Sequence, residues 1–310
     1  MGNQLFNFAA GYALAKQLGA DLAFSSHKIL PEDLLLPQMI GSLYREATPS
    51  ELFKVGKYPY KLILQQKLNR KIVNITRQFQ GYRPAQFSMD SILAFDYDAT
   101  VLTLDLPAYI TGFFQNEQYF ADYSTEIYTA AFSQLNKTSQ ISQLPKSIKH
   151  PVVAVSFRRG NYNPLGWSLP LHFYDRALDY LKEHTTIGTL LLFGDDWDFL
   201  DLVGERWSRS HSVFNALTLG SDPISQLSLM ADSEHCIVAN STFSWWGAWF
   251  GDQQHQNHHR IVIAPKEWIS GGTNNPAGKI IPDRWVKLPL ESEPERSSAV
   301  SIARFENNNS

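Results

Sequence analysis

Two adjacent arginines, Arg158 and Arg159, directly follow an apolar, β-branched run at residues 152–157 and precede Gly160. Such a run is typical of a strand that is buried on both faces of a parallel sheet. Guanidinium groups bind phosphate oxygens through paired hydrogen bonds and keep their positive charge. The arginine pair therefore indicates an anionic ligand at the end of this strand, with a structural ion pair to a nearby carboxylate as the competing interpretation.

Two adjacent carboxylates, Asp195 and Asp196, follow the next apolar strand at residues 190–193. Such a pair serves as acid–base groups, as metal ligands or as partners for arginine. No nearby histidine or third acid completes a metal site, and no Asp-x-Asp motif is present, so we expect a site that needs no metal. The structural alternative is that one carboxylate orients an arginine, or that Asp196 caps the following helix.

A third polar loop, residues 240–247, opens a predicted helix directly after the strand at 235–239. Free N–H groups at a helix N-terminus, together with serine and threonine hydroxyls, bind phosphate without a metal. A simple helix cap followed by buried tryptophans is the alternative. A weaker fourth element is the turn Gly2-Asn3-Gln4, which falls short of the G-x-G-x-x-G fingerprint but suits contact with a diphosphate or an acceptor hydroxyl.

The elements that must position these loops alternate between strand and helix beyond Pro107. Strands are expected at 152–157, 190–193, 213–217, 235–239 and 261–264. Helices are expected near 170–183, 196–203, 222–231 and 242–250. This alternation predicts a parallel sheet, whose ligands bind at the carboxyl ends of the strands, where the three loops lie.

A further helix is predicted at residues 4–18, very close to the first residue. A glycine-containing turn before a helix normally follows a strand, and no residues ahead of Gly2 form one. We therefore expect either that the native chain begins upstream of Met1 or that the N-terminal sheet is one strand short.

The composition limits the class of protein. With 310 residues, two domains are expected, and a net charge of −3 gives no global field that would recruit nucleic acid. Cys236 is the single cysteine, and no apolar run is long enough to span a membrane. Because the N-terminus lacks the pattern of a secretory signal, we expect a cytoplasmic, non-secreted enzyme. Residues 54–83 carry eight Lys or Arg and no acid, which suits peripheral membrane contact or, more simply, a solvated helix face.

Taken together, these segments resemble the galactoside α-1,2-fucosyltransferases, family 11 of the glycosyltransferases. The matching segments, in chain order, are GNQLFNFAAGYALA, GFFQNEQYF, VSFRRGNY, FGDD and NSTFSWWGAW, of which the last is the most specific. Two departures stand out: Ser156 occupies the position of the motif's histidine and Asn161 that of its aspartate. Asn161 can form hydrogen bonds but cannot accept a proton.

The resemblance implies an α/β fold of the GT-B type, with two Rossmann-like lobes and a cleft between them. The implied parts are an acceptor-side lobe with a helical insertion at 1–140, a GDP-fucose-binding lobe at 141–290 and a polar tail at 291–310. It also implies inverting transfer of L-fucose from GDP-β-L-fucose to the 2-hydroxyl of a terminal β-galactoside on an oligosaccharide or glycolipid. No metal or other cofactor is required in this scheme.

The same resemblance assigns residues to roles. Arg158 is placed on the β-phosphate of GDP, and Arg159 supports the loop or reaches the guanine. The remaining donor-binding residues are Asp195, Asp196, Asn240, Ser241, Thr242, Phe243, Ser244 and Trp245. The cleft is further expected to contain Gly2, Asn3, Gln4, Gln115, Asn161 and Tyr162. By chemistry alone, the candidates for the catalytic base are Glu117, Asp195 and His172, and the departing phosphate is a further option.

Other interpretations stay open. A fucosyltransferase of different linkage fits equally well, because donor motifs say little about the acceptor hydroxyl. A non-catalytic GDP-sugar or glycan-binding protein is compatible with Ser156 and Asn161. A nucleotide-dependent dehydrogenase shares the sheet type but would need a proper glycine fingerprint followed by an acidic ribose-binding residue.

Overall fold

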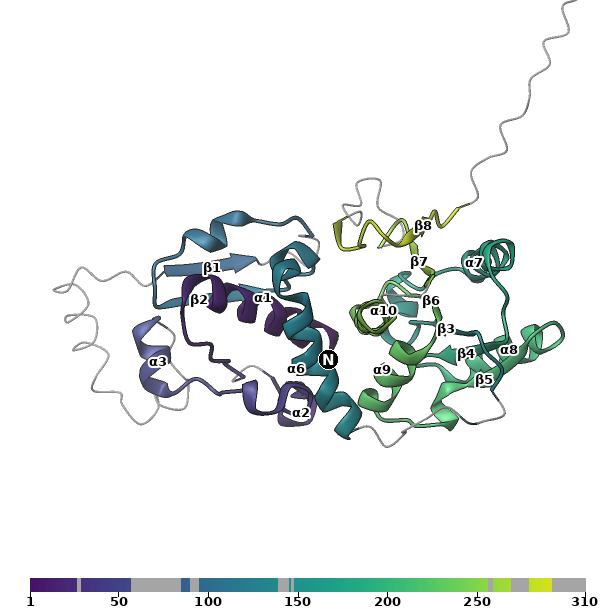
Figure 1. Cartoon of the computed structure of the whole chain (residues 1–310), viewed down its shortest axis with the longest axis horizontal. Coiled ribbons are helices and arrows are strands. Elements are labelled where there is room, and N and C mark those ends of the chain that lie inside the picture. The colour runs from purple at the N-terminus through teal and green to yellow at the C-terminus, as the bar shows by residue number, and fades with distance from the viewer. Residues whose placement is uncertain are drawn as a thin grey trace, which may run out of the picture.

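The computed structural model describes two lobes that lie side by side along the long axis of the molecule (Figure 1). The described residues are 1–26, 29–56, 85–89, 95–138, 145, 148–255, 259–268 and 279–291, with the backbone alone for 85–89 and 133–138. The predicted boundary at 140 and the tail beyond 291 lie outside these residues, as does nearly all of the basic stretch 54–83. Among the described helices, none is long and apolar enough to cross a membrane.

The second lobe is built on a six-stranded parallel sheet. Its strands are β3 (Val152–Ser156), β4 (Thr189–Phe193), β5 (Ser212–Asn215), β6 (His235–Ile237), β7 (Val262–Pro265) and β8 (Val286–Leu288). Their spatial order is β5-β4-β3-β6-β7-β8, so the order reverses between β3 and β6. Every residue of β3 and β4 is buried, as their apolar runs predict. The expected α/β architecture with a parallel sheet is confirmed, and the point of reversal is where such sheets bind ligands.

Helices cover both faces of this sheet, and their starting points follow from local caps. The helices are α7 (Leu171–His184), α8 (Trp197–Ser208), α9 (Pro223–Asp232) and α10 (Thr242–Gln254). Asp196 caps α8 by accepting from the N–H of Phe199, and Asp222 caps α9 in the same way. The strand predicted at 213–217 ends early because the Asn215 side chain accepts from the N–H of Leu217 and closes a turn.

The first lobe contains less regular structure. Its helices are α1 (Gly2–Leu18), α2 (Leu36–Ile40), α3 (Pro49–Lys54) and α6 (Ser124–Thr138), and its strands are β1 (Ala85–Met89) and β2 (Ala108–Gly112). The two strands pair in parallel, and Phe24 forms an isolated parallel bridge with Glu46. The predicted N-terminal helix is confirmed, and it ends at Gly19, whose φ of 61° suits glycine. The resemblance implies that the first lobe is Rossmann-like as well. Within the described residues, this lobe contains a two-stranded parallel sheet with covering helices.

An aromatic cluster joins the two lobes. Phe6 of α1 lies 4.6 Å from Trp245 and 5.0 Å from Trp246 of α10, measured between ring centres. Phe120, from the first lobe, stacks on Trp246 at 5.5 Å. Both tryptophans are fully buried, and the indole N–H of Trp246 donates to the carbonyl oxygen of Gly2 at 3.1 Å. The lobes therefore share one apolar core, which fixes the N-terminus of α1 against α10.

Close packing of α9 on α10 generates a testable prediction. A Cβ at Gly247 would lie 2.4 Å from the sulfur of the fully buried Met230. We expect Gly247→Ala to lower the free energy of unfolding by about 1–3 kcal/mol, because the methyl group overpacks this contact. Urea denaturation measures the change.

The matched control is Gly204→Ala in α8, where the nearest atom to an added Cβ is 3.9 Å away. Alanine favours helix over glycine by about 1 kcal/mol, so this variant should keep or gain stability. Equal changes in the two variants would contradict the close contact at Gly247.

Candidate functional site

A cavity of about 840 Å³ lies between the lobes, at the carboxyl ends of β3, β4 and β6. We call it the interlobe cleft. Its lining includes Met1, Gly2, Asn3, Gln4, Asn7, Phe95 and Gln115 from the first lobe. The second lobe contributes Ser156, Arg158, Asn161, Tyr162, Asp195, Asn240, Ser241, Thr242 and Phe243 among others. The cavity is within the range of roughly 300–1,000 Å³ that small-molecule sites occupy.

Arg158 extends into the cleft from the loop after β3. Its Nη1 lies 2.6 Å from Asp195 Oδ2, and its Nη2 donates to Asn161 Oδ1 at 2.7 Å. The guanidinium also lies 5.2 Å from the ring centre of Tyr162, whose pKa is raised by burial. The guanidinium is therefore held in place while 35% of the side chain stays exposed. Asn161 orients Arg158 by a hydrogen bond without adding a negative charge.

Asp195 is the carboxylate that organises this loop. Its Oδ1 accepts from the backbone N–H groups of Arg159 at 2.8 Å and Gly160 at 3.1 Å, while Oδ2 pairs with Arg158. A Cβ on Gly160 would lie 2.8 Å from Asp195 Oδ2, so the close approach requires glycine. Because three donors already engage this carboxylate, its geometry favours positioning Arg158 over accepting a substrate proton.

The second arginine points elsewhere. Arg159 Nε lies 3.2 Å from Asp196 Oδ2, and its guanidinium carbon lies 3.8 Å from the ring centre of Phe199. Asp196 also caps α8, which confirms the structural interpretation of that residue. Neither Arg159 nor Asp196 lines the cleft. The two arginines therefore have different positions: Arg158 lies in the cleft, and Arg159 is fixed against α8.

The N-termini of α1 and α10 meet in the cleft. Asn3 Oδ1 accepts from Thr242 Oγ1 and from Gln115 Nε2, each at 3.0 Å. A Cβ on Gly2 would lie 2.5 Å from Thr242, so only glycine allows this approach. Gln4 also lines the cleft, but its amide is bonded to the chain around the start of α2. Two helix N-termini, each with partial positive charge, therefore face one space.

Of the α10 residues expected to bind the donor, Ser244 and Trp245 lie in the core instead. Ser244 is fully buried and donates to the carbonyl oxygens of Ala239 and Ser241. The Trp245 indole N–H donates to the carbonyl oxygen of Ile280 at 2.7 Å. Helical geometry turns these side chains toward the sheet and the aromatic cluster, whereas Ser241, Thr242 and Phe243 stay at the cleft wall. We therefore leave Ser244 and Trp245 out of the binding set.

Asn240 has a buried acceptor without a partner among the described residues. Its Nδ2 donates to the carbonyl oxygen of Trp167 at 2.9 Å, and only 2% of the residue is exposed. Its Oδ1 is buried and has no hydrogen-bond partner within the described part of the chain. An unpaired buried acceptor costs roughly 1–3 kcal/mol, so this atom is suited to receive a donor group from a ligand in the cleft.

Glu117 lies outside the cleft, in a polar contact between the lobes. Its Oε1 accepts from the indole N–H of Trp249, and its Oε2 pairs with Arg284, both at 2.7 Å. Arg284 in turn pairs with Asp252 at 2.7 Å. His172 is also remote from the cleft, with Nε2 2.7 Å from the carbonyl oxygen of Leu290. Among the described carboxylates, Asp195 alone lines the cleft, and neither Glu117 nor His172 is positioned to act on a ligand there.

Sequence reasoning missed one wall of the cleft. Leu217, Ser221, Pro223 and Gln226 line it at the end of β5 and the start of α9, and Trp167 lines it beside Tyr162. The signal was present, because Asp222-Pro223 is a helix-start pattern directly after a predicted strand. Loops after parallel strands gather at one edge of the sheet, so the loop before Pro223 could have been placed beside the loops that begin near Arg158, Asp195 and Asn240.

The described residues were also searched for the carboxylate, histidine and cysteine clusters that hold metal ions. No group of three or more His, Cys, Asp or Glu side chains is placed to hold a metal ion within the described ranges. The expectation of a metal-independent site stays a prediction.

Comparison with known proteins shows which family the chain belongs to. The sequence model of glycosyl transferase family 11 matches residues 58–272. The chain belongs to glycosyl transferase family 11. An alpha-1,2-colitosyltransferase of Escherichia coli is 30% identical over 186 residues, which cover 57% of this chain and 61% of that protein. The O-antigen biosynthesis glycosyltransferase WbnK of Escherichia coli is 28% identical over 141 residues, 44% of each chain. The chain thus matches less than two thirds of the length of either relative.

Solved structures show weaker similarity. The fucosyltransferase NodZ from Bradyrhizobium has a TM-score of 0.39 and 13% identity, with 79% of this chain and 88% of that chain covered. POFUT1 in complex with GDP has a TM-score of 0.44 and 13% identity, with 85% and 94% covered. Similarity at this level carries no conclusion about the chemistry of the family 11 chain.

The placement of Glu117 generates a prediction about stability. Glu117→Ala leaves the Trp249 N–H and Arg284 without this partner, so we expect the free energy of unfolding to fall by about 1–3 kcal/mol. Arg284→Ala should show a similar loss, and the double variant should lose less than the sum of the two. Urea denaturation of the three variants measures both quantities.

The control is Asp179→Ala, which breaks an exposed pair with Lys182 on α7 and should change stability by less than about 0.5 kcal/mol. Strict additivity of Glu117→Ala and Arg284→Ala would show that the two side chains do not act together.

Proposed function

We propose that this family 11 glycosyltransferase moves L-fucose from GDP-β-L-fucose to the 2-hydroxyl of a terminal β-galactoside, with inversion to an α-1,2 linkage. The observation that carries the proposal is the position of Arg158. It lies at the point where the sheet order reverses, and it faces the N-termini of α1 and α10 across one cleft. That combination suits the diphosphate of a sugar nucleotide. The two-lobed GT-B arrangement, with the donor on the second lobe, belongs to the same proposal.

The proposed mechanism is electrostatic. When the bond between fucose C1 and the β-phosphate oxygen breaks, positive charge develops on the sugar and negative charge on the phosphate. A guanidinium already oriented by Asp195 and Asn161 stabilises that charge with little reorganisation. The N–H groups at the start of α10 add to this field. Arg158 thus supplies the role that a metal ion has in other transferases.

The proton of the acceptor hydroxyl also needs a destination. Asp195 is engaged by three donors, and Glu117 and His172 lie outside the cleft. We therefore propose that the departing β-phosphate takes the proton. The step is then dissociative: the bond between C1 and the phosphate oxygen breaks first, the acceptor oxygen bonds to C1 from the opposite face, and the hydroxyl proton passes late to an oxygen of the departed phosphate. Asn161 cannot compete as a base, because an amide does not accept a proton.

The nucleotide part of the donor has its own proposed contacts. Asn240 Oδ1 accepts a hydrogen bond from an N–H or O–H group of the nucleotide, because it is buried at the cleft wall and has no partner among the described residues. Ser241, Thr242 and Phe243 line the same wall. A cytoplasmic location and membrane contact through residues 54–83 remain predictions from the sequence.

A second sugar donor has specific support. The relative of 30% identity is named as an alpha-1,2-colitosyltransferase, so a colitosyl group in place of fucosyl is the alternative.

The decisive assay supplies GDP-fucose or GDP-colitose with a panel of β-galactosides in EDTA, and the products are identified by NMR. Fucose on O2 of galactose supports the proposal, and colitose there supports the alternative. Free sugar and GDP alone place the error in the acceptor, whereas no turnover favours a binding role.

Arg158 gives the sharpest mutational prediction. Arg158→Ala should lower turnover by on the order of 10²-fold or more, because one preorganised charge contact to the transition state is lost. It should also weaken GDP binding, which isothermal titration calorimetry measures in the same preparation.

Arg206→Ala is the matched control, since Arg206 forms an exposed pair with Asp175 on the outside of the second lobe. This variant should keep turnover and GDP affinity within about twofold of the parent, as expected for a surface ion pair. If Arg158→Ala retains more than half of the parent's turnover, the proposed role of Arg158 is wrong.

A further inference from the structure

The first lobe forms one wall of the interlobe cleft, and its polar side chains there are Asn3, Gln4, Asn7 and Gln115. Both ends of the Gln4 amide are bonded to the chain around the start of α2, and Asn3 and Asn7 are exposed. Gln115 is buried, with 4% of the residue exposed. Because burial restricts the rotamers of a side chain, a ligand in the cleft meets the Gln115 amide in a fixed position.

A hydrogen bond to Asn3 decides which end of the Gln115 amide faces the cleft. Gln115 Nε2 donates to Asn3 Oδ1 at 3.0 Å, and the same oxygen accepts from Thr242 Oγ1 at 3.0 Å. With Nε2 directed at Asn3, the other end of the amide is Oε1, and no group in the described part of the chain donates to it. The first-lobe wall of the cleft therefore presents a neutral hydrogen-bond acceptor.

The backbone around Gln115 forms a strained turn. Phe114 has a φ of 48°, a conformation that residues with bulky side chains rarely adopt. On the other side of Gln115, the buried Asn116 donates to the carbonyl oxygen of Phe95 at 2.7 Å and accepts from the N–H of Gln118 at 2.9 Å. Strained residues persist where the surrounding structure fixes them, and they cluster at active sites and ligand contacts. The turn thus holds Gln115 in one direction.

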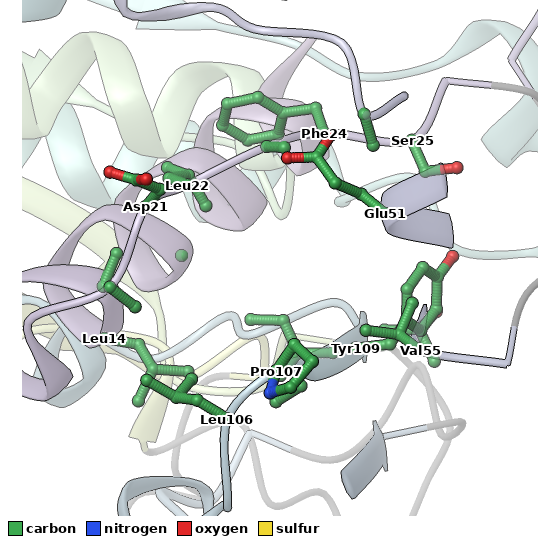
Figure 2. Close-up of a pocket in the computed structure, with 18 of the residues that line it drawn as sticks. Leu14, Asp21, Leu22, Phe24, Ser25, Glu51, Val55, Leu106, Pro107 and Tyr109 are labelled. Carbon is green, nitrogen blue, oxygen red and sulfur yellow. The ribbon is translucent and has the colours of Figure 1, made fainter. Parts of the chain in front are cut away.

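Phe114 and Gln115 line different spaces. Just beyond the end of β2 at Gly112, Phe114 lines a cavity of about 700 Å³ in the first lobe. Figure 2 shows this cavity between Phe24 on one side and Tyr109 on the other. Gln115 lines the interlobe cleft instead. The turn at Phe114 therefore directs the next side chain away from the first-lobe cavity and into the cleft.

Gln115 and the proposed donor contacts lie on different lobes. Asn3 connects Gln115 to Thr242 at the N-terminus of α10, and Arg158 enters the same cleft from the loop after β3. The diphosphate of the donor is proposed to lie at these second-lobe groups. In an inverting transfer, the acceptor oxygen reaches C1 from the face opposite the phosphate. The first-lobe wall, with the Gln115 amide on it, is the side from which that oxygen approaches.

We propose that Gln115 Oε1 accepts a hydrogen bond from the 2-hydroxyl of the acceptor and so positions the attacking oxygen. The inference rests on the proposed function. Because an amide does not accept a proton, Gln115 orients the hydroxyl without acting as a base. The bond between C1 and the phosphate oxygen breaks, the acceptor oxygen bonds to C1, and its proton then moves from Gln115 to an oxygen of the departed phosphate. Asn3 is a positioning residue, because it fixes the end of the amide that faces the hydroxyl.

The test compares two ligands that differ only in this hydroxyl. A β-galactoside and its 2-deoxy analogue are titrated into the parent chain and into Gln115→Met, with GDP present and no sugar donor, and NMR measures the dissociation constants. We expect the parent to bind the galactoside about tenfold more tightly than the analogue, as for one hydrogen bond. Gln115→Met keeps the length of the side chain without its oxygen, so it should bind the two ligands within about twofold of each other.

Further variants separate the contact with the hydroxyl from a purely structural role. Gln115→Glu keeps an oxygen at this position but no longer donates to Asn3, and it should retain a preference of at least about threefold. The matched control is Gln118→Ala, which removes an exposed glutamine just beyond the turn and should bind both ligands as the parent does. If Gln115→Met does not fold, Gln115→Asn takes its place, because it withdraws the amide by one carbon.

Three results would contradict these expectations. An unchanged preference in Gln115→Met, or no preference in the parent, would overturn the proposal. Loss of the preference in Gln115→Glu as well as Gln115→Met would also overturn it, because the bond to Asn3 would then carry the effect. Failure of the parent to transfer fucose or colitose to any β-galactoside would instead show that the proposed function is wrong, and the activity assay detects this before any variant is compared.

Discussion

The cleft depends on the contact between α1 and α10. Phe6 and Phe120 pack against Trp245 and Trp246 with ring centres 4.6 to 6.4 Å apart, and these side chains are fully or almost fully buried. Aromatic side chains bury large apolar areas, so this cluster stabilises the contact between the lobes. The indole N–H of Trp246 donates to the carbonyl oxygen of Gly2, which fixes the N-terminus of α1 against α10.

That contact determines where positive potential gathers. With α1 fixed on α10, the N-termini of both helices face the loop that carries Arg158. Each of these three groups, the two helix N-termini and the Arg158 guanidinium, attracts an anion only weakly by itself. The helix ends carry partial charges, and the field of the partly exposed guanidinium is screened by solvent and salt. Brought to one partly enclosed space, they act on the same ligand atoms. Asp195 and Asn161 hold Arg158 ready, and their own oxygens are occupied in doing so.

The polar residues of the motifs therefore separate into two groups. Arg158, Asp195, Asn161 and Thr242 face the cleft, whereas Arg159, Asp196, Ser244 and Glu117 hold the surrounding elements in place. The second group supports the first, because Asp196 fixes α8 beside the arginine loop and Glu117 connects the lobes through Trp249 and Arg284. A motif residue in this chain is thus as often part of the support as part of the site.

The sequence alone determined the second lobe and the position of its ligand edge. Parallel strands buried on both faces appear as unbroken apolar runs, and β3 and β4 lie where the runs at 152–157 and 190–193 predicted. Helix starts were equally local, because a cap such as Asp196 acts on N–H groups only three residues away. Residue type and position after a buried strand also indicated the arginine loop and the start of α10 as candidates, and the family 11 motifs include both.

Tertiary structure alone decided which candidates meet. Arg158 and Arg159 are neighbours of the same type, and only the fold around Asp195 and Phe199 directs one into the cleft and the other onto α8. Glu117 finds its ion-pair partner Arg284 at a separation of 167 residues. Contacts between distant segments leave no local period in the sequence, so no reading of spacing could have shown them.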